Sequence, residues 1–279
     1  MPDKKLRLDR DRIAINQITT NALTLTQAAE AYAAAGIKGI TPWRDKVEAV
    51  GVAAARQAIA DNGLTVTGFC VAGLFTRDGK GARTARIDDA RRAIDIAAEL
   101  GSPSIVTAVG GLLPDSKSLA EARSFAFDCL AETLEHARRA GVVMALEPLH
   151  PIYAPDWSVI TRLADANAWC DRLGDGIGLA LDAYHVWWDS DLWQGIEEAG
   201  KRNRLTTFHI SDWKMQTESL LWDRGIPGEG VIDLKAIYEA MSKAGFGGWV
   251  EVEIFSERHS ARPAAALIED IVAGCLNTM

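Results

Sequence analysis

The sequence predicts an α/β fold of the (β/α)8 TIM-barrel type. Short β-rich runs alternate with longer amphipathic stretches, eight such runs can be counted, and glycine repeatedly separates a helical stretch from the next strand. This alternation is typical of a parallel sheet with helical crossovers. Eight units favour closure into a barrel, and an open doubly wound sheet is the alternative if the strand count is wrong by one.

The predicted strands are Arg12–Asn16, Gly39–Pro42, Thr65–Val71, Ser104–Val109, Val142–Leu146, Ile177–Asp182, Leu205–Ile210 and Trp249–Phe255. Alanine-rich amphipathic stretches predict helices between them, among them Thr26–Ala35, Asp88–Leu100 and Ser118–Ala140. Glycine accepts the left-handed conformation that ends a helix. It stands at this position five times, as Gly36, Gly63, Gly101, Gly141 and Gly245.

Composition indicates one globular unit. The 279 residues are 48% hydrophobic and 24% charged, which suits a soluble protein with a sizeable core. No Pro/Ser-rich linker divides the chain, so we expect a single domain over residues 1–279. Barrels of this length commonly form one domain.

Charge and motifs exclude several partners. A net charge of -8 without a long basic run disfavours nucleic acid. No apolar run is long enough for a transmembrane helix, and the charged start MPDKKLRLDRDR is unlike a secretory signal. The four widely spaced cysteines predict buried thiols, and we expect a cytoplasmic protein. Neither GxGxxG after the first strand nor GxxxxGK[ST] occurs, which disfavours nucleotide cofactors.

Acids and a histidine interrupt the apolar strands near their C-terminal ends, where barrel active sites form. The four segments read VVMALEPLH, IGLALDAYH, LTTFHISDW and GWVEVEIFSE. They contain the candidate ligands Glu147, Asp182, His209 and Glu253. One such residue alone is commonly a cap or an ion-pair partner, but four on consecutive strands indicate a metal site. Three carboxylates and one imidazole suit one divalent ion, with Mn²⁺ favoured over Mg²⁺, Co²⁺ and Zn²⁺.

Strand geometry agrees with this site. Side chains two positions apart share a face of a strand. Small residues therefore precede three of the candidates on the inner face: Ala145, Ala180 and Thr207. The intervening residues are expected to pack outward against helices: Leu146, Leu181 and Phe208. Glu251 lies one layer below Glu253, where a buried acid needs a proton or a partner.

The chain resembles the xylose isomerase-like TIM-barrel superfamily, the sugar phosphate isomerase/epimerase family, over nearly its whole length. The resemblance rests on the Glu/Asp/His/Glu quartet named above. Two further motifs support it: Asp182-x-x-His185, and Arg224 shortly before the turn Pro227-Gly228-Glu229-Gly230. In ketose 3-epimerases of this superfamily the two metal-binding glutamates also act as acid and base. The resemblance implies the same for Glu147 and Glu253, and implies that His185 and Arg224 hold substrate oxygens.

One position departs from those epimerases. They usually carry a further glutamate six residues after the first ligand, where this chain has Tyr153, and His150 enters the same loop. Relatives that eliminate water or an alcohol from keto-polyols and keto-glycosides, such as inosose dehydratase, are therefore the alternative to an epimerase. His150 is a third candidate acid or base beside Glu147 and Glu253.

The predicted function is a metal-dependent sugar isomerase or epimerase. The expected mechanism is α-proton abstraction from a keto sugar or polyol through a metal-stabilised enediolate. Return of the proton gives epimerisation or isomerisation, and loss of a β-oxygen makes the enzyme a lyase. Trp43 and Trp213 are expected as pocket walls, and Lys214 as a contact to a substrate oxygen or phosphate.

Two other functional classes were weighed. A DNA-repair endonuclease of the same superfamily needs three metals and more histidine ligands than five histidines provide. A non-catalytic carbohydrate-binding barrel, or a subunit of a larger complex, needs no metal quartet. We further expect an unphosphorylated small sugar or polyol as the substrate, because no glycine-rich phosphate cradle follows strand seven or eight. Exposed helices and tryptophans favour a homo-oligomer, a dimer or a tetramer.

Overall fold

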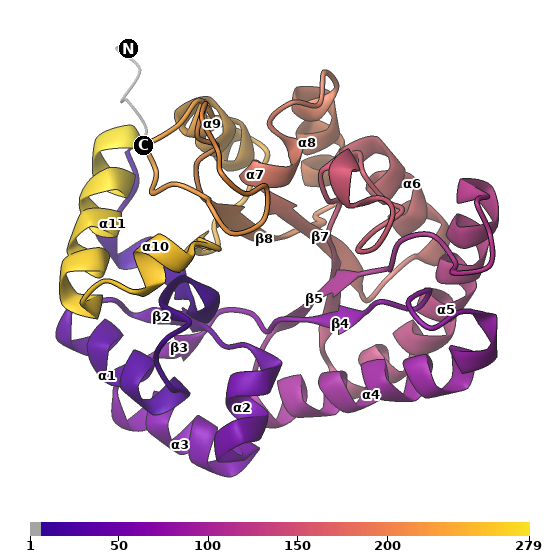
Figure 1. The fold of residues 1–279 in the computed structure, drawn as a ribbon, viewed down its shortest axis with the longest axis horizontal. Helices are drawn as coiled ribbons and strands as arrows, with labels where there is room; N and C mark the ends of the chain where they lie inside the picture. The colour runs from indigo at the N-terminus through magenta and orange to yellow at the C-terminus, as the bar shows by residue number, and fades with distance from the viewer. Residues whose placement is uncertain (1–6) are drawn as a thin grey trace.

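The computed structural model describes residues 7–279, which form a ring of strands surrounded by helices (Figure 1). Within these residues the sheet has nine parallel strands in the order β3-β2-β1-β9-β8-β7-β6-β5-β4. Their bounds are β1 Ile13–Asn16, β2 Gly39–Thr41, β3 Thr65–Val66, β4 Ala72–Gly73, β5 Ser104–Ala108, β6 Val143–Leu146, β7 Ile177–Asp182, β8 Leu205–Ile210 and β9 Val250–Val252. The predicted TIM-barrel fold is confirmed.

The third strand differs from its prediction. Instead of one strand over Thr65–Val71, the chain forms β3 and then β4, separated by a few extended residues. The segment changes hydrogen-bonding neighbours along its length: Cys70 N donates to Pro42 O beside β2 (3.1 Å), whereas Val106 N of β5 donates to Phe69 O (2.9 Å). A regular ladder therefore covers only its two ends. The segment nevertheless closes the ring between β2 and β5.

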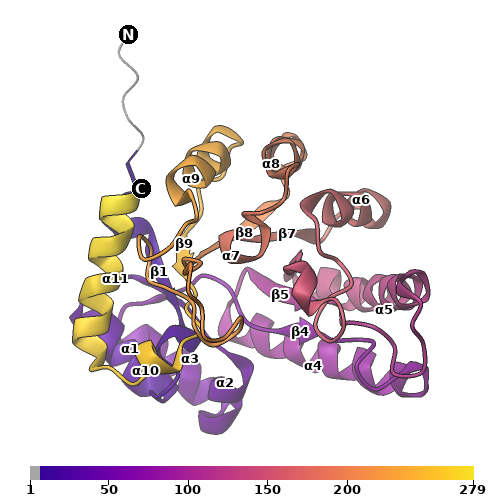
Figure 2. The same ribbon diagram turned by 45° about the horizontal axis from the view of Figure 1, so that its top comes forward.

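Helices cover the outside of the ring in both ribbon views (Figures 1 and 2). The long ones are α1 Leu25–Ala34, α3 Val52–Asp61, α4 Arg83–Leu100, α5 Leu119–Ala140, α6 Leu163–Leu173, α8 Leu192–Lys201, α9 Leu234–Lys243 and α11 Ala264–Thr278. Shorter helices are α2 Arg44–Val50, α7 Ala183–Val186 and α10 Glu257–Ser260, and single 3-10 turns are η1 Arg10–Arg12, η2 Gln17–Thr20, η3 Lys80–Ala82 and η4 Pro151–Tyr153. No helix among residues 7–279 is long and apolar enough to cross a membrane.

Local sequence explains where these helices begin and end. Thr24 and Gln27 form a capping box at the start of α1, so two amide groups that the helix leaves unpaired find partners. The five glycines predicted to end helices all have positive φ, between 65° and 94°: Gly36, Gly63, Gly101, Gly141 and Gly245. The glycine prediction is therefore confirmed.

Two separate apolar layers follow from strand alternation. A small cluster fills the inside of the barrel: Cys70, Val106, Ala145 and Ala180. The large core lies between the strands and the helices and contains Leu146, Leu181 and Phe208. The predicted inward and outward faces are thus confirmed for these strands. All four cysteines are buried and unpaired within the described residues, as predicted.

Closure of the barrel at β4 requires glycine at position 73. Its φ is +105°, and an added Cβ would lie 2.1 Å from the carbonyl oxygen of Ala108 on β5. We expect Gly73→Ala to destabilise the fold by about 2 kcal/mol or more. In a protein of this size that lowers the melting temperature by roughly 4–8 °C in a thermal scan.

Gly81→Ala is the matched control, because its Cβ would meet open space. It should change the melting temperature by no more than about 1–2 °C. Equal melting temperatures for the two variants would contradict the role of Gly73.

Candidate metal centre and its cleft

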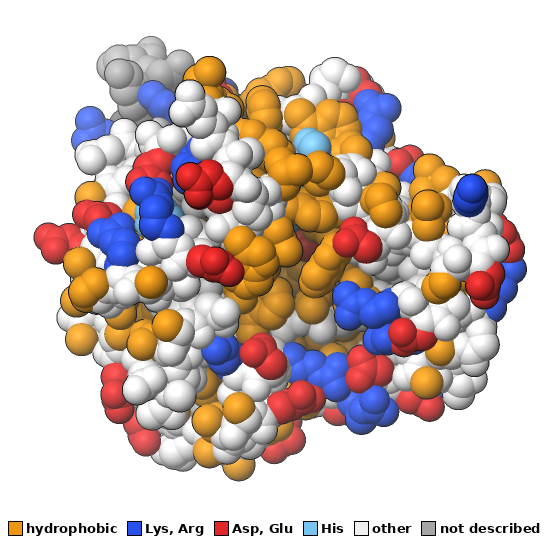
Figure 3. Space-filling model, viewed as in Figure 1, with side chains coloured by type: hydrophobic (Ala, Val, Ile, Leu, Met, Phe, Trp, Pro, Cys, Tyr) orange, Lys and Arg blue, Asp and Glu red, His pale blue; other side chains and the backbone are white. Residues whose placement is uncertain are grey.

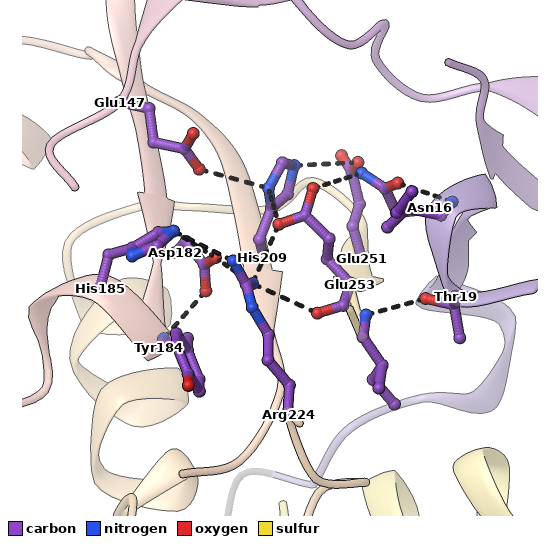
Figure 4. Close-up of polar contacts among 12 residues, drawn as sticks. Asn16, Thr19, Glu147, Asp182, Tyr184, His185, His209, Arg224, Glu251 and Glu253 are labelled. Carbon is purple, nitrogen blue, oxygen red and sulfur yellow. Dashed lines mark hydrogen bonds and ion pairs between the residues drawn. The ribbon is translucent and has the colours of Figure 1, made fainter. Parts of the chain in front are cut away.

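Four side chains from four consecutive strand ends converge at one mouth of the barrel (Figure 4). Glu147 follows β6, Asp182 ends β7, His209 lies near the end of β8, and Glu253 follows β9. Each offers one ligand atom, and these atoms lie within 4.8 Å of one another. None of the four residues is more than 7% exposed.

The donor atoms fit a divalent cation. Glu147 Oε1 and His209 Nδ1 are buried and have no hydrogen-bond partner among the described residues. His209 Nδ1 lies 3.7 Å from Glu147 Oε1 and 3.7 Å from Glu253 Oε2, too far for a hydrogen bond. Unpaired buried polar atoms are costly unless something else satisfies them. Three carboxylates and an imidazole facing one point could hold a metal of the Mn²⁺, Mg²⁺ or Zn²⁺ type.

Glu251 orients the imidazole from below. It is 2% exposed, and its Oε2 lies 3.3 Å from His209 Nε2. The hydroxyl of Thr41 on β2 also donates to this oxygen. The buried Glu251 carboxyl group thus has a hydroxyl and an imidazole as neighbours. With Glu251 beside Nε2, Nδ1 faces the other three candidate ligands and would offer its lone pair to a cation once it has lost its proton, as metal-binding histidines commonly do.

Arg224 lies beside the quartet and is 1% exposed. Its Nη1 donates to Asp182 Oδ2 (2.7 Å) and to Glu253 Oε2 (3.1 Å). The guanidinium lies between the rings of Tyr184 and Phe255, 4.4 and 4.6 Å from their centroids. Both of its faces are therefore covered by aromatic rings, which favours a buried cation. Arg224 holds two of the candidate ligands in place.

Asn16 ties the quartet to the wall of the cleft. It ends β1, and its Nδ2 donates to Glu253 Oε1 (2.9 Å). Its Oδ1 accepts a hydrogen bond from the indole Nε1 of Trp43. One amide group thus fixes both a candidate ligand and an aromatic wall residue. Both oxygens of Glu253 are engaged, one by Asn16 and one by Arg224.

Three carboxyl groups lie close together in the buried quartet, and each affects the pKa values of its neighbours. Burial raises the pKa of Glu147 and raises that of Asp182 to about 7. Burial also disfavours ionisation of Glu253, but His209 and Arg224 outweigh it and hold its pKa at about 2. Burial lowers the pKa of His209, but the surrounding carboxylates, Glu253 foremost, outweigh burial and raise this pKa well above its ordinary value. A bound dication would compensate the same charge excess.

Glu147 and Glu253 of the quartet line a cleft with a cavity volume of about 50 Å³. Hydrophobic side chains dominate the hollow at the centre of this face (Figure 3). Beside Glu147 and Glu253, three further polar side chains line it: Tyr153, His185 and Arg224. The rest of the wall is mostly apolar and consists of Trp43, Cys70, Val71, Val106, Ala108, Leu149, Trp157, Leu221 and Phe255. Such a cleft suits a small ligand with an apolar face and few polar anchors.

Of the other predicted site residues, Trp43, His185 and Arg224 line this cavity. His185 is buried, and its Nε2 lies 3.1 Å from Arg224 Nη2. Burial and the charge of Arg224 hold the pKa of His185 well below its ordinary value, so the ring is neutral. Trp213 lies outside the lining and stacks on Tyr184, with centroids 4.7 Å apart.

His150 and Lys214 also lie outside the cavity lining. The Nδ1 of His150 accepts a hydrogen bond from Ile152 N at the start of η4 (3.3 Å). Its ring packs against Trp213 at 5.1 Å. Lys214 forms an ion pair with Asp223. The structure thus engages both residues in local contacts away from the quartet.

Several residues of the site were not predicted from the sequence. Asn16 follows the same rule as the ligands, a polar side chain at a strand end, and that rule could have found it. Phe255 continues the last strand run two residues beyond Glu253 and shares its face. Tyr153 and Leu221 come from loops, and their place in the wall follows from tertiary contacts alone.

Comparison with known proteins gives the family. The family model described as xylose isomerase-like TIM barrel matches residues 29–273. The chain belongs to this family. A crystal structure of a protein from Sinorhizobium meliloti 1021 superposes with a TM-score of 0.94 at 42% identity, covering 97% of this chain and 99% of that one.

Two further comparisons concern activity and metal. A Streptomyces coelicolor protein provisionally named hydroxypyruvate isomerase is 29% identical over 83% of this chain and 85% of its own length. A solved structure described as the IOLI protein with a bound zinc atom has a TM-score of 0.82 at 21% identity, covering 96% and 97% of the two chains, and shares the fold. The curated relatives are named as isomerases or as an epimerase.

Removal of Glu251 should weaken metal binding. Glu251→Ala deletes the acceptor that orients His209, and loss of such a supporting contact typically costs 10–100-fold in metal affinity. We expect a fall of about that size for Mn²⁺ or Zn²⁺ in titration calorimetry, and an intermediate affinity for Glu251→Gln, which keeps an acceptor oxygen. The exposed Glu99→Ala is the control. Unchanged affinity in Glu251→Ala would contradict this role.

Metal affinity should rise with pH. Without a cation, Asp182 titrates at about 7 and His209 holds a proton well above its ordinary range, so each must lose its proton to become a ligand. Below about pH 7 binding displaces a proton from both Asp182 and His209, and above that pH from His209 alone. Affinity should increase by about tenfold per pH unit for each proton released. Calorimetry in two buffers of different ionisation enthalpy counts these protons. A pH-independent affinity would show that the ligands are already deprotonated.

Proposed function

We propose that this chain is a metal-dependent isomerase or epimerase of a keto sugar or keto polyol. The observation that supports it is the buried convergence of Glu147, Asp182, His209 and Glu253 at the bottom of an aromatic-walled cleft. The isomerase and epimerase names of the curated relatives support the same reaction class. In this proposal the four side chains are the metal ligands, and Mn²⁺ is the metal we favour.

Glu147 is the residue that we assign to proton transfer. Its Oε1 has no hydrogen-bond partner among residues 7–279, it lines the cavity, and burial raises its pKa. Glu253 also lines the cavity, but both its oxygens accept hydrogen bonds and its pKa is about 2. Environments that separate the pKa values of two carboxylates indicate different roles in acid–base chemistry. Glu253 is then the ionised partner on the other side.

The remaining residues of the cleft have supporting roles. When bound, a divalent cation supplies Lewis-acid polarisation of a carbonyl oxygen, which acidifies the neighbouring C–H group. We assign His185 and Arg224 to substrate oxygens because both line the cavity and the Arg224 guanidinium carries N–H donors; Nδ1 of the neutral His185 ring accepts a hydrogen bond from His150 N (3.3 Å). Trp43 and Phe255 cover the apolar face of a sugar ring and exclude water. Proton transfer then takes place between Glu147 and a carbon beside the carbonyl.

A lyase is the second candidate, and Tyr153 favours it. The position six residues after Glu147, where ketose 3-epimerases are expected to have glutamate, lies in the wall of this cavity. Here it is a tyrosine whose hydroxyl donates to Leu220 O (2.6 Å). A substrate therefore meets a ring edge instead of a carboxylate at this point. Elimination of a β-oxygen begins with the same proton abstraction by Glu147.

Proton exchange in deuterated water tests the proposal. Protein freed of metal by a chelator and reloaded with Mn²⁺ is incubated with hydroxypyruvate, an inosose, a free ketose and a 3-keto-glucoside. Proton NMR then follows the carbons beside each ketone. We expect metal-dependent deuterium incorporation with at least one substrate, and a rate at least about 100-fold lower in Glu147→Gln at saturating metal. Appearance of an enone would identify the lyase.

Glu99→Gln, an exposed glutamate on α4, is the control and should exchange at the parent rate. Absence of both exchange and elimination in metal-loaded protein would contradict the proposal for the substrates used. Full activity in Glu147→Gln would remove Glu147 from proton transfer and leave Glu253 as the base.

A further inference from the structure

The metal cleft continues into a second cavity. This outer cavity has a volume of about 460 Å³ and is open to solvent. It shares six lining residues with the inner one: Trp43, Cys70, Val71, Trp157, Leu221 and Phe255. Because the same six residues border both cavities, the two cavities lie directly next to each other. A ligand that fills the inner part can therefore extend into the outer part.

Aromatic rings line the passage between the two parts. Phe255 contacts both Trp43 and Trp222, with centroid distances of 5.6 and 5.4 Å in edge-to-face arrangements. Trp43 and Phe255 border both cavities, whereas Trp222 borders only the outer one. The row of rings thus runs from the quartet outward. Aromatic faces in this order can cover the C–H faces of two successive sugar rings.

Hydrogen bonds fix the position of the loop that carries Trp222. The hydroxyls of Tyr153 and Tyr184 both donate to the carbonyl oxygen of Leu220, at 2.6 and 3.0 Å. The backbone N of Trp222 also donates to the Ser219 side chain (3.1 Å). These bonds define the position of Trp222, so the outer wall is preorganised. Preorganised walls lower the entropic cost of binding.

Polar groups also line the outer cavity. Its lining includes Asn21 and, from α2, Arg44, Asp45 and Glu48. Asp45 and Glu48 are exposed, and Arg44 pairs with Glu48 and with Asp89. Blue and red side chains lie along the lower rim of the hollow in Figure 3. Carboxylates and a guanidinium facing an aromatic wall can bind ring hydroxyls, which an unsubstituted hydrocarbon group does not have.

We propose that the outer cavity is a subsite for a second sugar ring, and that the substrate is a keto-glycoside of two rings. The inner ring carries the ketone beside the quartet, and the outer pyranose, joined through a glycosidic oxygen, lies between Trp222 and α2. This inference rests on the proposed function for the chemistry of the inner ring. In a closed keto ring Glu147 takes the proton from one face of the carbon beside the ketone, a proton from solvent is delivered to the opposite face of the same carbon, and Glu147 releases its own proton to solvent, so epimerisation conserves all atoms.

Binding and exchange of matched ligands test the subsite in the metal-loaded protein. The one-ring ligand is methyl 3-keto-β-D-glucopyranoside. The two-ring ligands are the 3-keto derivatives of cellobiose and maltose, which differ in linkage. Calorimetry gives Kd and deuterium exchange gives KM. We expect at least one two-ring ligand to bind about tenfold or more tightly than the one-ring ligand.

Trp222→Ala should reduce this preference by about tenfold or more, and Trp222→Phe should restore most of it because it keeps an aromatic ring. Asp45→Asn changes an exposed side chain and leaves the core intact, and it should weaken binding of the two-ring ligand more than binding of the one-ring ligand. Trp193→Ala is the matched control, since Trp193 on α8 is 50% exposed and borders neither cavity. It should leave the preference unchanged.

The outcomes separate the two proposals. If two-ring ligands bind preferentially through Trp222 but no ligand exchanges or eliminates, the subsite stands and the proposed function fails. If exchange occurs but both disaccharide derivatives bind no better than the methyl glycoside, the subsite is overturned and the function stands. An equal loss for one-ring and two-ring ligands in Trp222→Ala would also overturn the subsite.

Discussion

Buried negative charge at the mouth of the barrel is the constraint on which the rest of the site depends. Glu147, Asp182, Glu251 and Glu253 are all nearly inaccessible to water, and Arg224 is the cation that contacts two of them. Burial of so many carboxylates is unfavourable without compensation. The neighbouring side chains stabilise this buried charge. Aromatic rings cover the guanidinium, Thr41 donates to Glu251, Asn16 donates to Glu253, and the ligand atoms of the quartet face one common point.

The fold could be predicted because its main signals are local. Periodicity distinguishes strands from helices, and glycines with positive φ mark the helix ends. The division of the third strand could not be predicted in this way. The residues between β3 and β4 are extended and partly apolar, as in a strand. What interrupts the ladder is the change of partner from β2 to β5, and that is a property of barrel closure, not of the segment itself.

In the candidate site, too, residues on strands could be predicted from the sequence, whereas residues in loops could not. Residues on strands follow from alternation, so the positions of Glu147, Asp182, His209 and Glu253 could be anticipated from their spacing. Residues in loops follow from tertiary contacts. Trp213 and Lys214 come just after β8 and were expected at the cleft, but one stacks on Tyr184 and the other pairs with Asp223. Tyr153 and Leu221 reach the cleft because loops from different parts of the chain meet at the carbonyl oxygen of Leu220.

The amide of Asn16 couples two parts of the site. It joins Glu253 to the indole of Trp43, so the acidic cluster and the aromatic wall share one rigid connector. Any shift of the carboxylate on ion capture is transmitted to the indole, and a sugar pressed against the indole acts back on the carboxylate with the same coupling free energy. Under the proposed function, uptake of the ion and uptake of the sugar are therefore thermodynamically linked, and tryptophan emission offers an optical signal of both.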